Sequence, residues 1–243
     1  MSTTFIPSRF ILGLCLGLMA LTASPAPAQA QEDTYALQKY SGPLDWRRTL
    51  FAPFGQKMLS FEVPVGMCFL DETDPVEGLA VKEIRDIMRK KSRQSLVAVF
   101  ADCLQIAGIG QGAGEIDLAD LGLITWLNHH GETFPAGREA YLDLRATNLH
   151  QSTQAGLAGY TNPVIDENVH RTANGVTLGF VGDIEIAYQK MKTVGITGTT
   201  TLRHFPVEIL LTQTAKEPQK TQKELQDMMD HLLAQQVALN AVE

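Results

Sequence analysis

The sequence has few cysteines, and their positions limit the chemistry open to it. Three occur in 243 residues, and the first, Cys15, lies in a segment that we expect to be removed. The other two, Cys68 and Cys103, do not form a Cys-x-x-Cys pair, the spacing that tunes thiol exchange. We therefore predict a single Cys68–Cys103 disulfide, which removes both sulfurs from the candidate nucleophiles.

The sequence also lacks an apolar run long enough to cross a membrane. The run at residues 10–21 is 12 residues long, whereas a spanning helix needs about 20. With Arg9 before it and Ala28-Gln29-Ala30 after it, this run predicts a signal peptide over residues 1–30, cleaved after Ala30. We expect a periplasmic mature chain with no transmembrane segment.

An excess of basic residues is missing as well. The chain has 20 Lys and Arg against 27 Asp and Glu, and loss of the leader would remove only Arg9 from these. Proteins that bind nucleic acid usually carry a basic excess or a basic stripe, so we expect no nucleic-acid partner. Residues 31–56 follow no period and predict an irregular N-terminal arm, and residues 57–243 have the length and composition of one globular domain.

Familiar catalytic and cofactor motifs are absent from the sequence. None of the serines after residue 30 lies in a G-x-S-x-G or S-x-x-K motif. Gly108, Gly110, Gly112 and Gly114 fall at every second position and match neither the dinucleotide-binding nor the P-loop pattern. We interpret them as a flexible loop, and we expect no cofactor.

The first half of the globular segment predicts a strand–helix–strand unit. Residues 57–63 alternate in polarity, as a half-buried strand does, and residues 96–101 are continuously apolar, as an interior strand is. Between them, Asp74, Pro75 and Glu77 predict the start of a helix over about residues 75–91. If the two strands are parallel neighbours, Cys68 and Cys103 follow them at one edge of the sheet, close enough to bond.

The second half predicts one more strand, a helix, a meander and a terminal helix. A strand is expected at residues 121–127, a helix at about 135–151, and short antiparallel strands between 164 and 212. Thr221 and Glu224 form a capping box before an amphipathic helix at about 221–239. The predicted fold is a single α+β domain with a mixed or antiparallel sheet packed by about three helices. Its order of elements is loosely similar to that of small exported domains of the PsbP type, although no motif carries the likeness.

Two polar clusters are candidate sites. His129, His130 and Glu132 carry side chains that ligate zinc, but adjacent histidines cannot both face one way on a strand, so a polar turn is favoured and no metal is expected. Asp71, Glu72 and Asp74 lack the alternation and the glycine of a calcium loop. Their place before a helix favours a role at its positive end over acid–base work.

Two apolar features could contact a partner. Trp46-Arg47-Arg48 with Phe51 and Phe54 resembles a recognition patch, although such aromatic residues more often pack on their own domain. The terminal helix could join two copies of the chain, but an amphipathic helix usually covers its own sheet. The oligomeric state is left open.

These observations favour a non-catalytic envelope protein that binds another envelope protein or a small-molecule ligand. A periplasmic hydrolase with a site built from His129, His130, Glu132 and a distant acid is the first alternative. A thiol-redox or metal-handling protein that uses Cys68, Cys103 and the neighbouring Met67 is the second.

Overall fold

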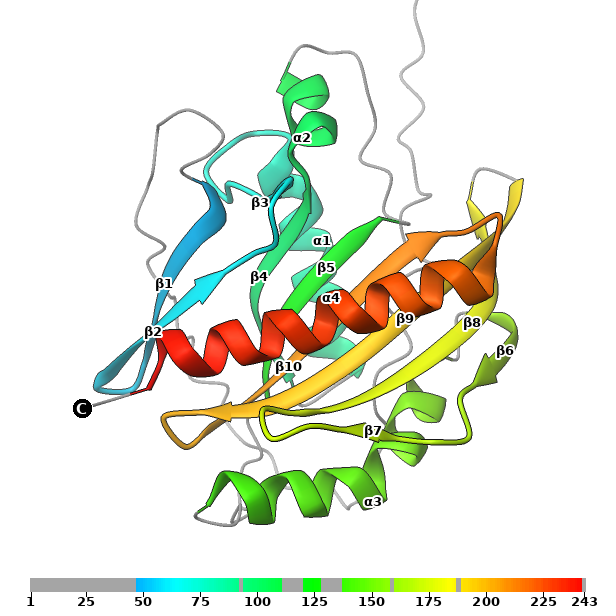
Figure 1. Cartoon of the computed structure of the whole chain (residues 1–243). Coiled ribbons are helices and arrows are strands. Elements are labelled where there is room, and N and C mark those ends of the chain that lie inside the picture. Colours follow the sequence, from blue (N-terminus) through cyan, green and yellow to red (C-terminus); the bar gives the residue numbers. More distant parts are fainter. Residues whose placement is uncertain are drawn as a thin grey trace, which may run out of the picture.

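The computed structural model describes residues 47–91, 94–110, 120–127, 137–157, 160–186 and 189–241 (Figure 1). The elements follow one another as β1 Thr49–Phe54, β2 Lys57–Glu62, β3 Met67–Phe69, α1 Glu77–Lys91, β4 Gln94–Asp102, α2 Cys103–Gly110, β5 Leu121–Leu127, α3 Arg138–Gly156, β6 Thr161–Ile165, β7 His170–Arg171, β8 Val176–Ile186, β9 Gln189–Leu202, β10 Phe205–Thr214 and α4 Pro218–Leu239.

An eight-stranded sheet forms the centre of the molecule. Its strands are ordered β3-β4-β5-β10-β9-β8-β6, with β7 also paired to β8, and β1 and β2 form a separate two-stranded sheet. Every pairing among the described strands is antiparallel. The prediction of an α+β domain is confirmed, and strands and a helix follow one another here in the predicted order. The two predicted strands are not parallel neighbours, because β2 pairs with β1 in the separate sheet and β4 pairs with β3 antiparallel.

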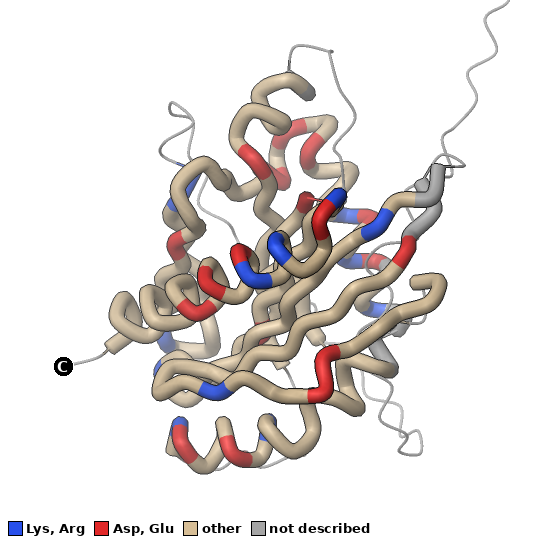
Figure 2. The backbone as a smooth tube through the Cα atoms, turned by 45° about the vertical axis from the view of Figure 1, so that its right-hand side comes forward, with Lys and Arg blue, Asp and Glu red and all other residues tan. Residues whose placement is uncertain are grey.

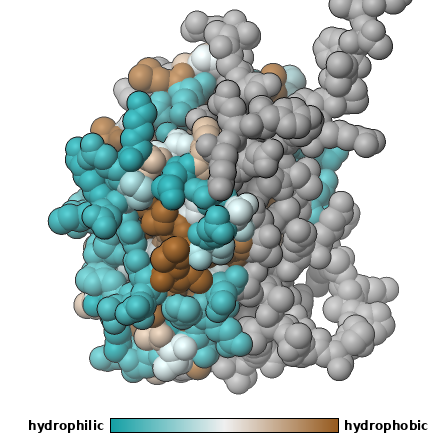
Figure 3. All heavy atoms as spheres, turned by 90° about the vertical axis from the view of Figure 1, so that its right-hand side faces the viewer, coloured by the Kyte–Doolittle hydropathy of each residue, from teal (hydrophilic) through white to brown (hydrophobic). Residues whose placement is uncertain are grey.

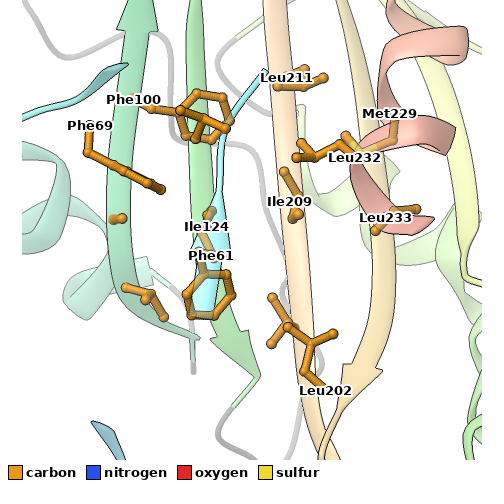
Figure 4. Packing of buried hydrophobic residues seen from close by; sticks show 14 of the residues in the cluster. Phe61, Phe69, Phe100, Ile124, Leu202, Ile209, Leu211, Met229, Leu232 and Leu233 are labelled. Atoms are coloured by element: carbon orange, nitrogen blue, oxygen red, sulfur yellow. The ribbon is translucent and has the colours of Figure 1, made fainter. Parts of the chain in front are cut away.

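Helices cover both faces of the sheet. In Figure 1, α4 crosses the front of the sheet, α1 lies behind it and α3 lies along its lower part. The buried cluster on the front face joins the β1–β2 hairpin, the sheet and α4. Figure 4 shows its side chains converging from β2, β4, β5, β10 and α4. Met229, Leu232 and Leu233 of α4 are buried there, and burying a side chain of this size contributes about 1.5–3 kcal/mol.

The end of the segment predicted to be an irregular arm is a strand. Residues 49–54 form β1, which pairs along its length with β2, and Gly55 in the turn between them has a φ of 60°. Pro53 argues against a strand in the sequence, because proline cannot donate a ladder hydrogen bond. It is tolerated here because β1 has a partner on one side only.

The other edge of the hairpin is held by the side-chain amides of Gln236 in α4 and of Asn240, the C-cap residue of that helix. Gln236 accepts from the backbone N–H of Glu62 at 3.1 Å and donates to its carbonyl at 2.7 Å. Asn240 makes the same two bonds to Ser60, at 2.9 Å and 2.7 Å. Residues four apart on a helix lie on one face, and residues two apart on a strand share an edge. The pairs of bonds therefore imitate a neighbouring strand and fix the hairpin to the domain.

The helices α2 and α4 differ from expectation. Residues Cys103–Gly110 form the additional helix α2, so Gly108 and Gly110 lie in a helix rather than in the predicted loop. The helix α4 begins at Pro218 after the N-cap residue Glu217, three residues before the predicted capping box at Thr221. Proline suits the first turn of a helix because it has no N–H to leave unpaired there, and this explains the earlier start.

Candidate functional site

The two cysteines form the predicted disulfide. Cys68 lies in β3 and Cys103 begins α2, with their Cα atoms 5.0 Å apart. The topology differs from the predicted one, because Cys68 pairs with Ala101 across antiparallel strands and the backbone N–H of Cys103 donates to Gly66 at 2.8 Å. Cys68 is buried. A buried, bonded sulfur serves the packing of the domain, and it gives no support to a thiol-redox site with Met67.

Two exposed apolar side chains flank this disulfide. Val65 and Leu104 are the most exposed large apolar residues of the described part of the chain, at 85% and 81%. Val65 projects from a tight turn in which Met67 N–H donates to the Pro64 carbonyl and Gly66 takes a φ of 90°, a conformation suited to glycine. Local backbone geometry therefore holds Val65 outward.

Leu104 is held in a similar way at the start of α2. The Asp102 carboxylate accepts the backbone N–H groups of Leu104 at 2.7 Å and Gln105 at 3.2 Å, which caps the helix. Two residues further on, about half a helical turn, Ile106 is buried in the cluster that contains Cys68. The inward Ile106 and the disulfide fix α2, so Leu104 faces solvent on a rigid support.

The predicted acidic cluster shapes the start of α1. Asp74 accepts the backbone N–H groups of Val76 at 2.8 Å and Glu77 at 3.0 Å, as an N-cap residue does. Glu72 forms an ion pair with Arg85 of the same helix. Within the described part of the chain, no three His, Cys, Asp or Glu side chains are grouped to hold a metal ion.

Arginines of the predicted recognition patch are bound within the domain. Arg47 makes two 2.8 Å bonds to the carboxylate of Glu77, and Glu77 in turn accepts the backbone N–H of Asp71 at 2.7 Å. Arg48 bonds to Glu62 at 3.2 Å. These arginines therefore connect the entry of the chain to α1 and β2. Trp46, the first residue of the predicted patch, lies outside the described residues.

A buried ion pair lies under α3. The carboxylate of Glu208 in β10 is 1% exposed and pairs with Arg145 Nη2 at 2.8 Å, while Gln94 Nε2 donates to it at 3.2 Å. Burial raises the pKa of Glu208 above its ordinary value, and the charge of Arg145 and the bond from Gln94 partly oppose that rise. In the neighbouring turn of α3, burial raises the pKa of Tyr141 to about 12.

Hydrogen bonds tie this cluster to the middle of the sheet. Thr125 and Thr199 stand opposite Glu208 on the two adjacent strands. The Tyr141 hydroxyl bonds to the Thr199 hydroxyl at 2.8 Å, and Thr199 also donates to the Val207 carbonyl at 3.1 Å. The ionisable groups face protein on every side that the structure describes. We assign them the role of fixing α3 on the sheet.

The predicted histidine site cannot be compared with the structure, and the buried Glu208–Arg145 pair was not predicted. His129, His130 and Glu132 lie outside the described residues. The Glu208–Arg145 pair was missed, although Glu208 is the one charged residue in the apolar run at residues 205–212. An acid inside such a run indicates a buried partner, but its partner lies 63 residues away in α3.

Comparison with known protein families and with curated proteins finds no match for this chain.

Proposed function

We propose that the chain is exported by a signal peptide at residues 1–30 and acts in the periplasm as a non-catalytic binding protein of the cell envelope. The leader pattern and the Cys68–Cys103 disulfide support this compartment, since structural disulfides persist where the surroundings are oxidising. No helix of the described part of the chain is long and apolar enough to span a membrane.

The pair of exposed apolar side chains beside the disulfide carries the binding proposal. Contiguous exposed apolar patches mark interaction sites, and Val65 and Leu104 lie on segments that the disulfide and the Cys103–Gly66 hydrogen bond join. Three polar groups that stand out in the structure also have roles within the domain: Glu208 is buried against Arg145, and Asp74 and Asp102 cap helices. A rigid support lowers the entropic cost of binding, because less of the surface has to be ordered when the partner binds. The geometry thus favours recognition over catalysis.

Export is tested by the mass of the protein recovered from the periplasmic fraction of an expressing cell. The expected species begins at Gln31 and contains the linked Cys68–Cys103 peptide in full yield. A retained leader, or two thiols that react with an alkylating reagent without reductant, would contradict the proposed compartment.

Binding is tested by photo-cross-linking in intact cells. A benzophenone side chain is introduced separately at Leu104, Val164, Leu144 and Lys223, four exposed positions on different elements. The proposal expects a defined covalent adduct from at least one position. If no position gives an adduct, and the purified chain hydrolyses an ester, amide or phosphate panel in a manner abolished by His129→Ala and His130→Ala, the hydrolase alternative replaces it.

A further inference from the structure

We propose that the partner binds at the disulfide end of the molecule, defined by Val65, Val76, Leu79 and Leu104, and that the bound segment is basic with an apolar face. This inference rests on the proposed binding function and names its surface and the chemistry of its partner.

The apolar part of the surface comes from three neighbouring segments. Val65 and Leu104 are exposed chain neighbours of Gly66 and Cys103, whose backbone hydrogen bond joins the two segments. Figure 1 shows the start of α1 at the same end of the sheet, below α2. Leu79 is 63% exposed in the first turn of α1, and Val76, the residue before the helix, is 51% exposed. The two residues that follow Leu79, Ala80 and Val81, pack in the buried cluster of Cys68, which brings the segments together.

The same end of the molecule is acidic. Figure 2 shows Asp and Glu gathered beneath α2 and around the start of α1. Two arginines, Arg47 and Arg85, are engaged there in ion pairs with Glu77 and Glu72. The acids in this region outnumber them and are Asp71, Glu72, Asp74, Glu77 and Asp102. With five carboxylates against two guanidinium groups, the formal charge of the described segments around the apolar side chains is −3.

This combination of charges selects among three possible occupants. A second copy docked face to face would bring the same acids against each other, since a two-fold interface repeats one surface. An anionic lipid surface would also be repelled, because such membranes attract basic segments. A Lys- or Arg-bearing protein segment gains from the acids in rate and specificity, and from Val65 and Leu104 through apolar burial.

The opposite edge of the sheet offers a matched control. Figure 3 shows the β6 side of the molecule, where a small hydrophobic area lies among hydrophilic atoms. Val164 of β6 is 67% exposed and is the one large apolar side chain of that strand with such exposure. It resembles Leu104 in exposure and apolar character. A substitution there perturbs the surface without touching the disulfide end.

The test uses purified mature protein and three labelled amphipathic peptides of equal length. All three share a leucine face, and their polar faces carry lysine, glutamate or glutamine. Fluorescence anisotropy is measured with the wild type, with Leu104→Gln combined with Val65→Gln, and with Val164→Gln. Circular dichroism confirms that each variant folds, as expected for substitutions of exposed side chains.

We expect the lysine peptide to bind the wild type at least tenfold more tightly than the glutamate peptide. The Val65 and Leu104 double variant, which keeps every acid, should weaken lysine-peptide binding at least tenfold, and Val164→Gln should leave it unchanged. Equal binding of the lysine and glutamate peptides, no binding of either, or an unaffected double variant overturns the proposal. Cross-links from Val164, Leu144 or Lys223 with none from Leu104 would also overturn it, while the proposed function would stand.

Discussion

Replacing Arg145 by methionine should expose how strongly the buried Glu208 depends on its partner. Arg145→Met preserves the bulk of the side chain and removes the charge 2.8 Å from the Glu208 carboxylate, leaving Gln94 as the side-chain donor described at that carboxylate. Breaking a buried pair in this way costs about 3–5 kcal/mol, because the remaining charge is neither solvated nor compensated. The free energy of unfolding at pH 7 should fall by that amount.

Protonation of Glu208 limits the cost and gives it a pH dependence. The unfolded glutamate has a pKa near 4.3, and Arg145→Met removes the charge that opposes the burial-driven rise in the folded pKa of Glu208, so that pKa should rise further. At pH 7, holding a proton on Glu208 in the folded variant costs about 3.7 kcal/mol, which is 1.36 kcal/mol for each pH unit between about 4.3 and 7. Because the pKa of Glu208 is higher in the folded variant than in the unfolded chain, the variant is most stable below pH 4.3. Its stability falls as the pH rises through the folded pKa. The cost should therefore shrink to about 1 kcal/mol at pH 5.

Urea unfolding followed by circular dichroism at pH 5 and pH 7 measures these differences. Arg171→Met, which removes an exposed partner of Asp143, is the matched control and should cost less than about 1 kcal/mol at both pH values. Combining Arg145→Met with Glu208→Gln removes both charges and should recover most of the loss. Equal costs for Arg145→Met and Arg171→Met, without pH dependence, would refute this account of the buried pair.

Three further predictions concern other parts of the domain. The pKa of Tyr141 is about 12, so wild-type stability should fall by up to about 2.7 kcal/mol between pH 10 and 12, and Tyr141→Phe should remove that excess slope in alkaline unfolding curves. Asn240→Ala leaves the two backbone groups of Ser60 without their side-chain partner, and should lower the midpoint of urea unfolding by the equivalent of about 1–3 kcal/mol, with faster amide exchange confined to the hairpin. Cys68→Ser with Cys103→Ser opens the loop spanned by a 35-residue separation, and should cost about 4 kcal/mol in thermal unfolding; a loss under 1 kcal/mol would contradict the stabilising role.

The sequence was most informative where a pattern is local. Continuous apolar character predicted β4 and β5. Asp74, a residue type that caps helices, predicted the start of α1, and its bond to the Glu77 N–H confirms that role. It was misleading for β1, since Pro53 interrupts a strand pattern that tertiary pairing with β2 restores. The helix α2 was missed because Gly108 and Gly110 disfavour helices, whereas a cap and a disulfide stabilise this one.

Contacts between distant segments were beyond prediction. Cysteine counting identified the Cys68–Cys103 bond, but strand order cannot be read from a count, and the bond closes antiparallel rather than parallel strands. The partnership of Arg145 with Glu208 depends on how α3 lies on the sheet. The exposed position of Leu104 likewise follows from α2. A candidate surface of this kind becomes visible only when the fold brings its segments together.

Photo-cross-linking from Leu104 in the exported, oxidised protein tests the central claim most directly, with Val164 as its reference position. The account predicts one defined protein adduct from Leu104, lost when Val65 is also replaced by glutamine, and little or none from Val164. Absence of any adduct from Leu104, in cells where the mature disulfide-bonded chain is shown to accumulate, would contradict it.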